Sequence, residues 1–292
     1  MNSELRSLVT HFPTSLLDYS RVLEEYDNAS FIIYAGGTYL MSRGLLYPML
    51  SPNMQIISID EIPELKNFLR NDTYIEFGSM CTLSDLRTKG KGTLPKVLID
   101  NIESVGFNTI RNSITVGGTI ASPLYNSLIA TLILLNANVE VLTKTKTKRK
   151  VKKITIKRLF DKDTPFFDMQ KTLITKVRVN TAYHKFSYFK AAGNSFEDED
   201  AVSLACVGNE SHSYELAYTI NGKGYCLLSE IDERISQMSF PDKNYKEEIT
   251  EIISILNLYL GQMSKLQEAR VYSLTKNLIE TLNEESLYNI YS

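Results

Sequence analysis

The first part of the chain changes from a helical to a strand-like pattern of apolar positions. Apolar side chains recur every three or four residues at Leu16, Tyr19, Leu23 and Tyr26. This spacing predicts a helix over 16–27 that stops near Asn28. The run "SFIIYA" at 30–35 is apolar and rich in β-branched and aromatic residues, which predicts a short buried strand.

The same alternation between helix and strand continues further along the chain. "MQIISI" at 54–59 predicts a second strand, and "IPELKNFL" at 62–69 predicts a short helix. "TYIEFGS" at 73–79 alternates between apolar and polar residues in the way a half-buried strand should. A helix is expected to begin in "CTLSDLRTK", with Thr82 or Ser84 as its N-cap.

Two longer patterns complete the first two-thirds of the chain. "SLIATLILLNA" at 127–137 is apolar on all sides and predicts a buried helix. "VEVLTKTKTKRKVKKITI" at 139–156 predicts two strands joined by a charged turn. We interpret the lysine-rich part, 144–153, as the solvent face of this hairpin, where charges protect an exposed edge. A docking strip for an acidic partner or for nucleic acid is the alternative.

Strand-like runs dominate from Thr181 onward, and the chain ends in a helical pattern. The runs are "AYHKFSYFKAA" at 182–192, "AVSLACVG" at 201–208 and "YELAYTI" at 214–220, and "NGKG" is a hairpin signal. Residues 245–287 are helical in period and in charge pairing. We therefore expect two domains, 1–180 and 181–292.

Two similar glycine turns are the main candidates for chemistry. "FIIYAGGTYLMSRG" at 31–44 and "IRNSITVGGTIAS" at 110–122 each place a Gly-Gly-Thr after a strand-like run. Glycines without a Cβ let consecutive N–H groups approach an anion, and the threonine adds a hydroxyl donor. Two such turns could hold the two phosphates of a dinucleotide. Taken alone, either is more often a simple tight turn, and neither fits G-x-G-x-x-G or a P-loop.

Composition narrows the class of protein. The 292 residues carry a formal net charge of -2, which provides no overall attraction for nucleic acid or an anionic membrane. The longest apolar run, 128–135, is far shorter than the ~20 residues that span a bilayer, and the N-terminus does not resemble a signal peptide. Cys81, Cys206 and Cys226 are isolated, which disfavours disulfides and a cysteine-held cluster. A reducing, cytoplasmic setting is expected.

Side-chain catalysis and metal binding are not predicted. Four consecutive acids, Glu197 to Asp200, are interpreted as a solvated loop, because they cannot all face one ion on a regular element. The histidines, His11, His184 and His212, are scattered, and no cysteine or paired acid lies at ligand spacing from them. No catalytic triad is evident.

Three ordered motifs resemble a known family. "AGGTYL", "FGSMCTLSDL" at 77–86 and "IRNSITVGGTIAS" follow one another at the spacing of the FAD-binding medium subunit of molybdenum hydroxylases, the xanthine dehydrogenase and carbon monoxide dehydrogenase group. The resemblance implies an α+β fold. Its first part would be a two-subdomain FAD-binding domain of the vanillyl-alcohol-oxidase (PCMH) type. A smaller α+β C-terminal domain, with a short antiparallel sheet and helices, would follow.

The resemblance also implies the cofactor contacts. The backbone amides of the first turn would wrap the FAD pyrophosphate at Ile33, Tyr34, Ala35, Gly36, Gly37, Thr38, Tyr39 and Leu40. The second turn would bind the other side of the cofactor through Ile114, Thr115, Gly118 and Thr119. Ile174 matches an aliphatic residue that covers the flavin ring, Lys190 matches a lysine near it, and Asp200 matches an acid that helps order its region. The chain departs from the family pattern at Tyr39, Thr119 and Asn126.

The function implied is electron transfer through FAD, in which the cofactor carries the redox step. Electrons would arrive from an iron–sulfur small subunit and leave to NAD+ or another acceptor, while a molybdopterin-binding large subunit would oxidise the substrate. The chain would thus be a xanthine dehydrogenase-like oxidoreductase subunit, active only in a complex. The alternative is a non-catalytic subunit that binds FAD or a nucleotide, or a structural subunit that has lost flavin.

Overall fold

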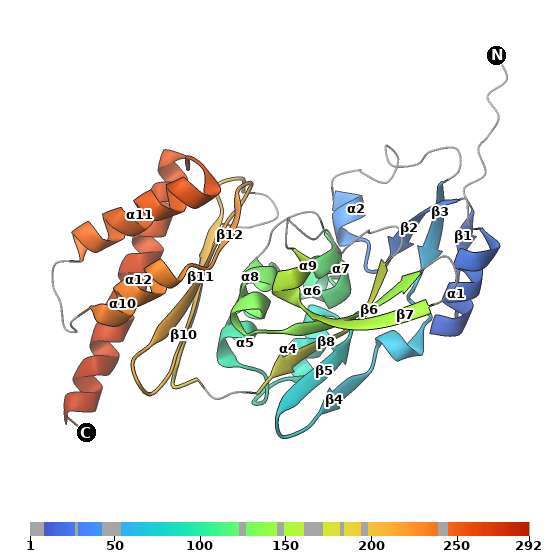
Figure 1. Ribbon diagram of the computed structural model, residues 1–292, viewed down its shortest axis with the longest axis horizontal. Coiled ribbons are helices and arrows are strands. Elements are labelled where there is room, and N and C mark those ends of the chain that lie inside the picture. Colours follow the sequence, from blue (N-terminus) through green and yellow to red (C-terminus); the bar gives the residue numbers. More distant parts are fainter. Residues whose placement is uncertain are drawn as a thin grey trace, which may run out of the picture. The chain divides into compact units, whose positions relative to one another are not determined.

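The computed structural model describes residues 9–26, 29–42, 54–122, 127–144, 149–160, 172–181, 184–193, 198–238 and 245–291. The chain forms two compact units (Figure 1). The first unit comprises Met1–Gly90, Phe107–Ser122 and Asn136–Asn180. The second comprises Lys91–Gly106, Pro123–Leu135 and Thr181–Ser292, so two short segments from the first half of the chain belong to it.

The first unit begins with a small parallel sheet of order β1-β3-β2. Its strands are β1 Thr10–His11, β2 Ser30–Tyr34 and β3 Met54–Ser58. Helix α1, Leu16–Glu25, is capped by Ser15, whose hydroxyl accepts from the Asp18 N–H at 3.0 Å, and it buries Tyr19 and Leu23. The predicted helix and the predicted strands at 30–35 and 54–59 are confirmed; Asn28 lies outside the described residues.

The larger sheet of the first unit is antiparallel and five-stranded, of order β4-β5-β8-β6-β7. Its strands are β4 Phe68–Arg70, β5 Tyr74–Gly78, β6 Asn138–Lys144, β7 Arg149–Thr155 and β8 Thr172–Asn180. The hairpin predicted over 139–156 is confirmed as β6 and β7, while its turn, 145–148, lies outside the described residues. Helix α9, Ile156–Leu159, follows β7.

Ion pairs cover the polar face of this sheet. The Glu76 carboxylate on β5 lies 2.6 Å from an Arg178 guanidinium nitrogen and 3.2 Å from the Lys176 ammonium, both on β8. Arg178 also stacks over the Tyr74 ring at 3.9 Å. Burial raises the pKa of Glu76, but the hydrogen bonds from Arg178 and Lys176 outweigh it and hold the pKa below its usual value. The strand predicted at 73–79 is confirmed as β5, but four of its five residues are buried, so it is more buried than the predicted half-buried strand.

Two sequence interpretations in the first unit are wrong. The strand-like run before the second glycine pair is instead the end of α6, Asn108–Arg111, followed by a turn and an isolated β-bridge between Thr115 and Thr82. Thr115 then caps α7, Val116–Ala121, which contains the glycine pair. The helix predicted at 62–69 is only a 3-10 turn, Pro63–Leu65, since Phe68 and Leu69 pair with β5 as strand β4. The helix expected near Thr82 is confirmed as α4, Leu83–Lys89.

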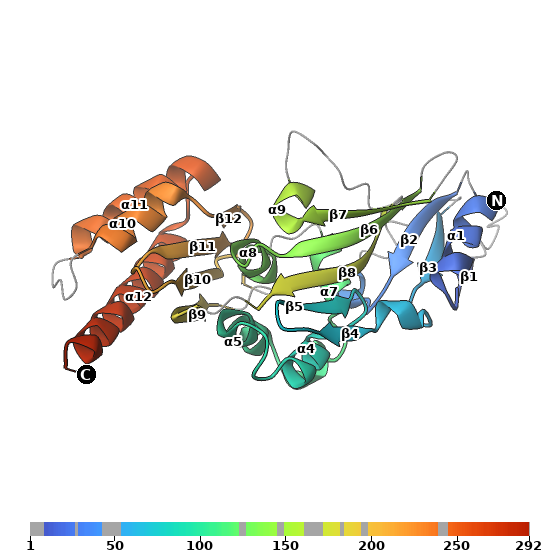
Figure 2. The same ribbon diagram turned by 60° about the horizontal axis from the view of Figure 1, so that its bottom comes forward.

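The second unit is built on an antiparallel sheet of order β12-β11-β10-β9 (Figure 2). Its strands are β9 Phe186–Ala192, β10 Val202–Gly208, β11 Tyr214–Ile220 and β12 Gly224–Cys226. Residues 221–223 form the predicted hairpin turn between β11 and β12. The helical end is α10 Ser229–Gln237, α11 Lys246–Leu260 and α12 Lys265–Tyr291, which pack on the sheet around Leu204, Tyr218 and Ile252.

Two helices from the first half of the chain also pack on this sheet. They are α5 Lys96–Ser104 and α8 Ser127–Leu134, which contact β9, β10 and β11. All eight residues of α8 are buried, as the apolar pattern predicts. The Asn101 side chain joins the two helices, because its amide donates to Thr131 at 2.7 Å and its oxygen accepts from Ser127 at 2.9 Å. Among the described residues, no helix combines the length and apolar character needed to cross a bilayer.

Candidate cofactor-binding site

The first glycine turn connects β2 to a short helix. The ladder between β2 and β3 ends where the Ile59 N–H donates to the Tyr34 carbonyl at 3.0 Å. Ala35, Gly36 and Gly37 then form the turn before α2, Thr38–Ser42, whose first bond is from the Met41 N–H to the Gly37 carbonyl at 2.9 Å. Gly37 has a φ of +69°, a left-handed conformation that other residues rarely adopt.

The backbone donors of this turn are unused. Within the described ranges, the N–H groups of Ala35, Gly36, Gly37 and Thr38 donate to no backbone or side-chain acceptor. All four residues are partly exposed, so a ligand can reach the turn. Consecutive N–H groups around a left-handed glycine form a concavity suited to an anionic oxygen.

The second glycine turn uses its donors inside the protein. The Val116 N–H donates to the Cys81 carbonyl at 3.0 Å, and the Gly117 N–H donates to the Ser79 carbonyl at 2.8 Å. The Gly118 N–H donates to the Thr115 hydroxyl at 3.2 Å. The second turn is therefore a capped helix start anchored to the segment after β5, and it differs from the first turn in this respect.

The first and second glycine turns pack against each other. A Cβ built on Gly36 would sit 1.7 Å from the carbonyl oxygen of Ser113, and one built on Gly118 would sit 4.0 Å from the Cβ of Ala35. Gly36 therefore permits a close approach between the two backbones that any side chain would prevent. The structure thus brings the predicted residues 33–40 and 114–119 together.

The second of the three family motifs, residues 77–86, attaches the second turn to the five-stranded sheet. The Leu83 N–H donates to the Ile114 carbonyl at 3.0 Å, and the Ser79 N–H donates to the Thr175 carbonyl of β8 at 2.9 Å. A register shift between β6 and β8 follows at this point and pairs Ile174 with Val141. Ile174 is buried, with 4% of its surface exposed, and lies next to the residue that anchors this motif.

Lys190 lies in the other unit. It is an exposed residue of β9, and its ammonium is 5.7 Å from the centre of the Tyr188 ring.

The structure describes two of the three positions at which the chain departs from the family pattern. Tyr39 lies in α2, and the Thr119 hydroxyl donates to the Thr115 carbonyl at 3.0 Å. Asn126 lies outside the described residues.

The acidic segment before β10 is ordered by side-chain contacts with α12 and the turn that precedes it. Asp198 pairs with Arg270 at 2.7 Å, and the Asp200 carboxylate accepts from the Ser264 hydroxyl at 2.6 Å. The Gln267 amide donates to the carbonyls of Glu199 and Asn221. Glu197 lies outside the described residues. Nowhere in the described ranges do three or more metal-ligating side chains cluster, and the cysteines are buried and unbridged.

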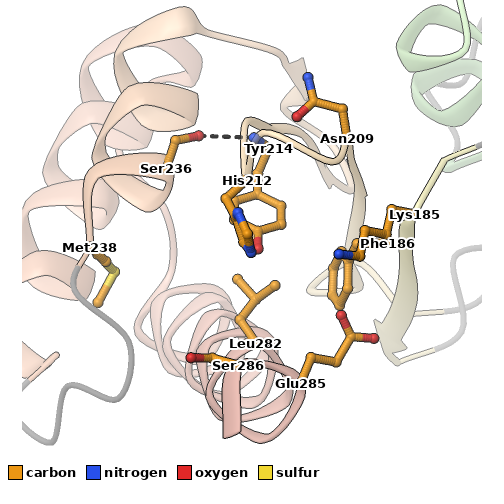
Figure 3. A pocket seen from close by; sticks show the side chains of 10 residues that line it. All are labelled: Lys185, Phe186, Asn209, His212, Tyr214, Ser236, Met238, Leu282, Glu285 and Ser286. Carbon is orange, nitrogen blue, oxygen red and sulfur yellow. Dashed lines mark hydrogen bonds between the residues drawn. The ribbon is translucent and has the colours of Figure 1, made fainter. Parts of the chain in front are cut away.

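A cavity of about 270 Å³ lies in the second unit, and none of its lining residues is a predicted site residue (Figure 3). Its apolar wall includes Phe186 and Tyr214, whose rings meet edge to face at 5.6 Å, and Leu282. Lys185 and Glu285 lie at its polar side. Sequence reasoning gave no sign of it, because its lining comes from four separated elements.

Comparison with known proteins identifies the family of the chain. Residues 5–181 match the family described as the FAD binding domain in molybdopterin dehydrogenase. The match covers more than half of the chain, so the protein belongs to this family. No curated protein matches the sequence.

Solved structures show the same fold along nearly the whole chain. Carbon monoxide dehydrogenase from Hydrogenophaga pseudoflava has a TM-score of 0.72 at 17% identity, covering 92% of this chain and 95% of that chain. Quinoline 2-oxidoreductase from Pseudomonas putida 86 has a TM-score of 0.71 at 14% identity, covering 97% and 99%. Carbon monoxide dehydrogenase from Oligotropha carboxidovorans has a TM-score of 0.71 at 15% identity, covering 94% and 96%.

These matches confirm the family resemblance, the α+β fold of the FAD-binding type and FAD as the cofactor. The geometry of the first turn fits that cofactor. Its N–H groups have no acceptor among the described residues and can meet a pyrophosphate, and Gly36 and Gly37 let Ser113 and Tyr34 pack closely against the turn. The individual contact residues remain predictions.

Proposed function

We propose that this chain is the FAD-binding electron-transfer subunit of a molybdenum hydroxylase such as xanthine dehydrogenase. The observation that carries the proposal is the first glycine turn. Its four N–H groups have no acceptor among the described residues, they surround a left-handed glycine, and the turn is held against the second turn. FAD bound there would accept electrons and pass them on, while the chain would hold and orient the cofactor.

Each predicted residue then has a separate task. Ala35 to Thr38 bind the pyrophosphate through the backbone. Thr115 and Thr119 shape the opposite wall, and Ile174 covers the ring. Lys190 places a positive charge near the flavin and favours its reduced, anionic form.

The partners are part of the proposal. An iron–sulfur small subunit supplies electrons, a molybdopterin-binding large subunit oxidises the substrate, and NAD+ or another compound accepts the electrons. The family match and the fold shared with carbon monoxide dehydrogenases and quinoline 2-oxidoreductase support this arrangement. The chain is then active as an oxidoreductase only in the complex, in a cytoplasmic setting.

One observation favours the alternative of a non-catalytic nucleotide-binding subunit. The N–H groups of Gly117 and Gly118 are already paired within the protein, so the second turn offers a cofactor fewer donors than the first. A nucleotide held by the first turn alone would satisfy this geometry without any redox role.

Titration with FAD and with FMN tests the proposal. The purified chain is freed of bound flavin and titrated with each, followed by flavin fluorescence. Tighter binding of FAD is expected, because only FAD carries the pyrophosphate that the turns would clasp. Equal affinity for FMN would contradict it. A chain that binds ADP but no flavin would support the alternative.

A further inference from the structure

The side chain of Tyr34 lies over the first glycine turn. A Cβ built on Gly37 would sit 2.3 Å from the Tyr34 hydroxyl oxygen and 2.6 Å from the ring carbon Cζ. Since Tyr34 is the last residue of β2, its ring folds back over the turn that follows its own strand. The phenol can come this close to the backbone only because residue 37 is a glycine.

The Tyr34 hydroxyl has a hydrogen bond to give. Within the described part of the chain, no carbonyl or side-chain oxygen accepts from it. Tyr34 is only partly buried, so an incoming group can reach the hydroxyl. A phenol beside a backbone turn usually finds an acceptor when a partner covers it.

The neighbouring donors define what that acceptor is. The hydroxyl lies close to Gly37, and the N–H of Gly37 is one of the four N–H groups of the turn that have no acceptor among the described residues. A phenol O–H and several backbone N–H groups in one place are all donors. An anionic oxygen would satisfy them together, and hydrogen bonds to an ionised acceptor are stronger than neutral ones.

We propose that the Tyr34 hydroxyl donates a hydrogen bond to a pyrophosphate oxygen of FAD, adding a side-chain donor to the backbone amides of the first turn. The proposal rests on the proposed function of this site. Tyr34 would be a binding residue with no part in electron transfer itself.

A purely structural role makes a different prediction. If the ring only fills the space over Gly37 and keeps that residue in its left-handed conformation, the hydroxyl is irrelevant. Tyr34→Phe separates the two roles, because it removes the oxygen and keeps the ring. Tyr74→Phe is the matched control, since it removes a hydroxyl from a strand of the same unit that lies outside the predicted cofactor contacts.

The full chain and both variants are titrated with FAD, and their thermal unfolding without flavin is recorded. Tyr34→Phe should bind FAD about 10-fold more weakly, the equivalent of about 1.4 kcal/mol for one hydrogen bond to a charged group. Its melting temperature should match that of Tyr74→Phe, which keeps full affinity. Unchanged FAD affinity in Tyr34→Phe overturns the proposal, as does a loss accompanied by lower stability. Failure of the unmodified chain to bind FAD would instead overturn the proposed function.

A second measurement uses the unmodified chain. With tyrosine labelled by ¹³C at Cζ, ADP should shift the Tyr34 resonance, whereas adenosine, which has no phosphate, should not. A Tyr34 resonance that responds equally to both compounds, or to neither, would overturn the hydrogen bond.

Discussion

The backbone N–H of Leu216 donates to the Asp232 carboxylate at 2.8 Å. Leu216 lies on β11, beyond the three residues that pair with the short strand β12. The next N–H on the same side, that of Tyr214, donates to Ser236 at 2.9 Å. Asp232 and Ser236 are one turn apart on α10. Their side chains therefore accept hydrogen bonds from the two N–H groups of β11 that a longer strand β12 would otherwise pair with.

The Asp232 carboxylate makes stability depend on pH. Burial, helped by the nearby charges of Glu215 and Glu233, raises its pKa to about 6, although the bond from Leu216 acts in the opposite direction. The folded state therefore keeps a proton that the unfolded chain releases near pH 4. Stability from this group is present below about pH 4 and is lost as the pH rises to about 6.

Asp232→Asn should remove this loss, because the amide oxygen still accepts from Leu216 and carries no charge. Urea unfolding should show the variant more stable than the unmodified protein by about 1–2 kcal/mol at pH 8, allowing for the partial exposure of Asp232, and equal to it near pH 4. Asp232→Ala leaves the Leu216 donor unpaired and should lose about 1–3 kcal/mol. A difference between Asp232→Asn and the unmodified protein that does not vary with pH would contradict the assignment.

Gly36 and Gly37 should respond differently to alanine. A Cβ on Gly36 meets the backbone carbonyl of Ser113 at 1.7 Å, which cannot move without separating the two turns. A Cβ on Gly37 meets only the end of the Tyr34 side chain, which can swing away, although the φ of +69° still carries strain. Gly36→Ala is therefore expected to lose FAD and at least about 2 kcal/mol of stability, and Gly37→Ala about 1 kcal/mol. Urea unfolding and flavin titration measure both; equal losses would show that Ser113 is not a rigid neighbour.

Lys190 should affect the flavin potential more than the FAD affinity. Removing a positive charge near the ring disfavours the reduced cofactor, so Lys190→Ala should lower the midpoint potential by about 30 mV, the equivalent of about 1.4 kcal/mol for a two-electron couple. Lys190→Arg keeps the charge and is the matched control. Spectroelectrochemistry of the flavin-loaded chain measures both. An unchanged potential in Lys190→Ala would remove this residue from the flavin site.

The Glu76 ion pairs should contribute stability only while the carboxylate is ionised. Because the pKa of Glu76 is held below its usual value, this stability is present above that value, near pH 4.5, and is lost as the pH falls. Glu76→Gln is expected to cost about 1–3 kcal/mol at pH 7, because Lys176 and Arg178 lose their partner. The difference from the unmodified protein should shrink on acidification in urea titrations. A cost that stays constant down to pH 3 would rule out this origin.

Sequence reasoning succeeded where a local pattern decides the structure. The apolar spacing of α1, the Thr82 cap and the all-apolar α8 were each readable from a few neighbouring residues. It failed at 110–116, because isoleucine and threonine there favour a strand, while the Thr115 cap and the bonds from Val116 and Gly117 to Cys81 and Ser79 start a helix directly after Thr115. Those partners are distant in sequence, so no local pattern reveals them.

The same distinction applies to the site. The glycine pairs were visible as letters, and the family resemblance supplied the cofactor. That the Ser113 carbonyl faces Gly36, that Thr115 occupies the Gly118 N–H and that the Tyr34 phenol covers Gly37 are outcomes of packing. The sequence contains a tyrosine before the turn but no indication that its ring folds back.

The position of α5 and α8 affects how the chain can fold during synthesis. These helices contact β10 and β11, yet they leave the ribosome about 70–110 residues earlier than the strands they cover. A fragment that begins at residue 181 would leave the side of β10 bearing Ser203, Ala205 and Val207 without these helices. Contacts over such long sequence separations slow folding, because a large loop must close before they form. The second unit therefore cannot be completed until β9 to β12 and the helices after them have been synthesised, and in the meantime the apolar α8 must be kept from aggregating.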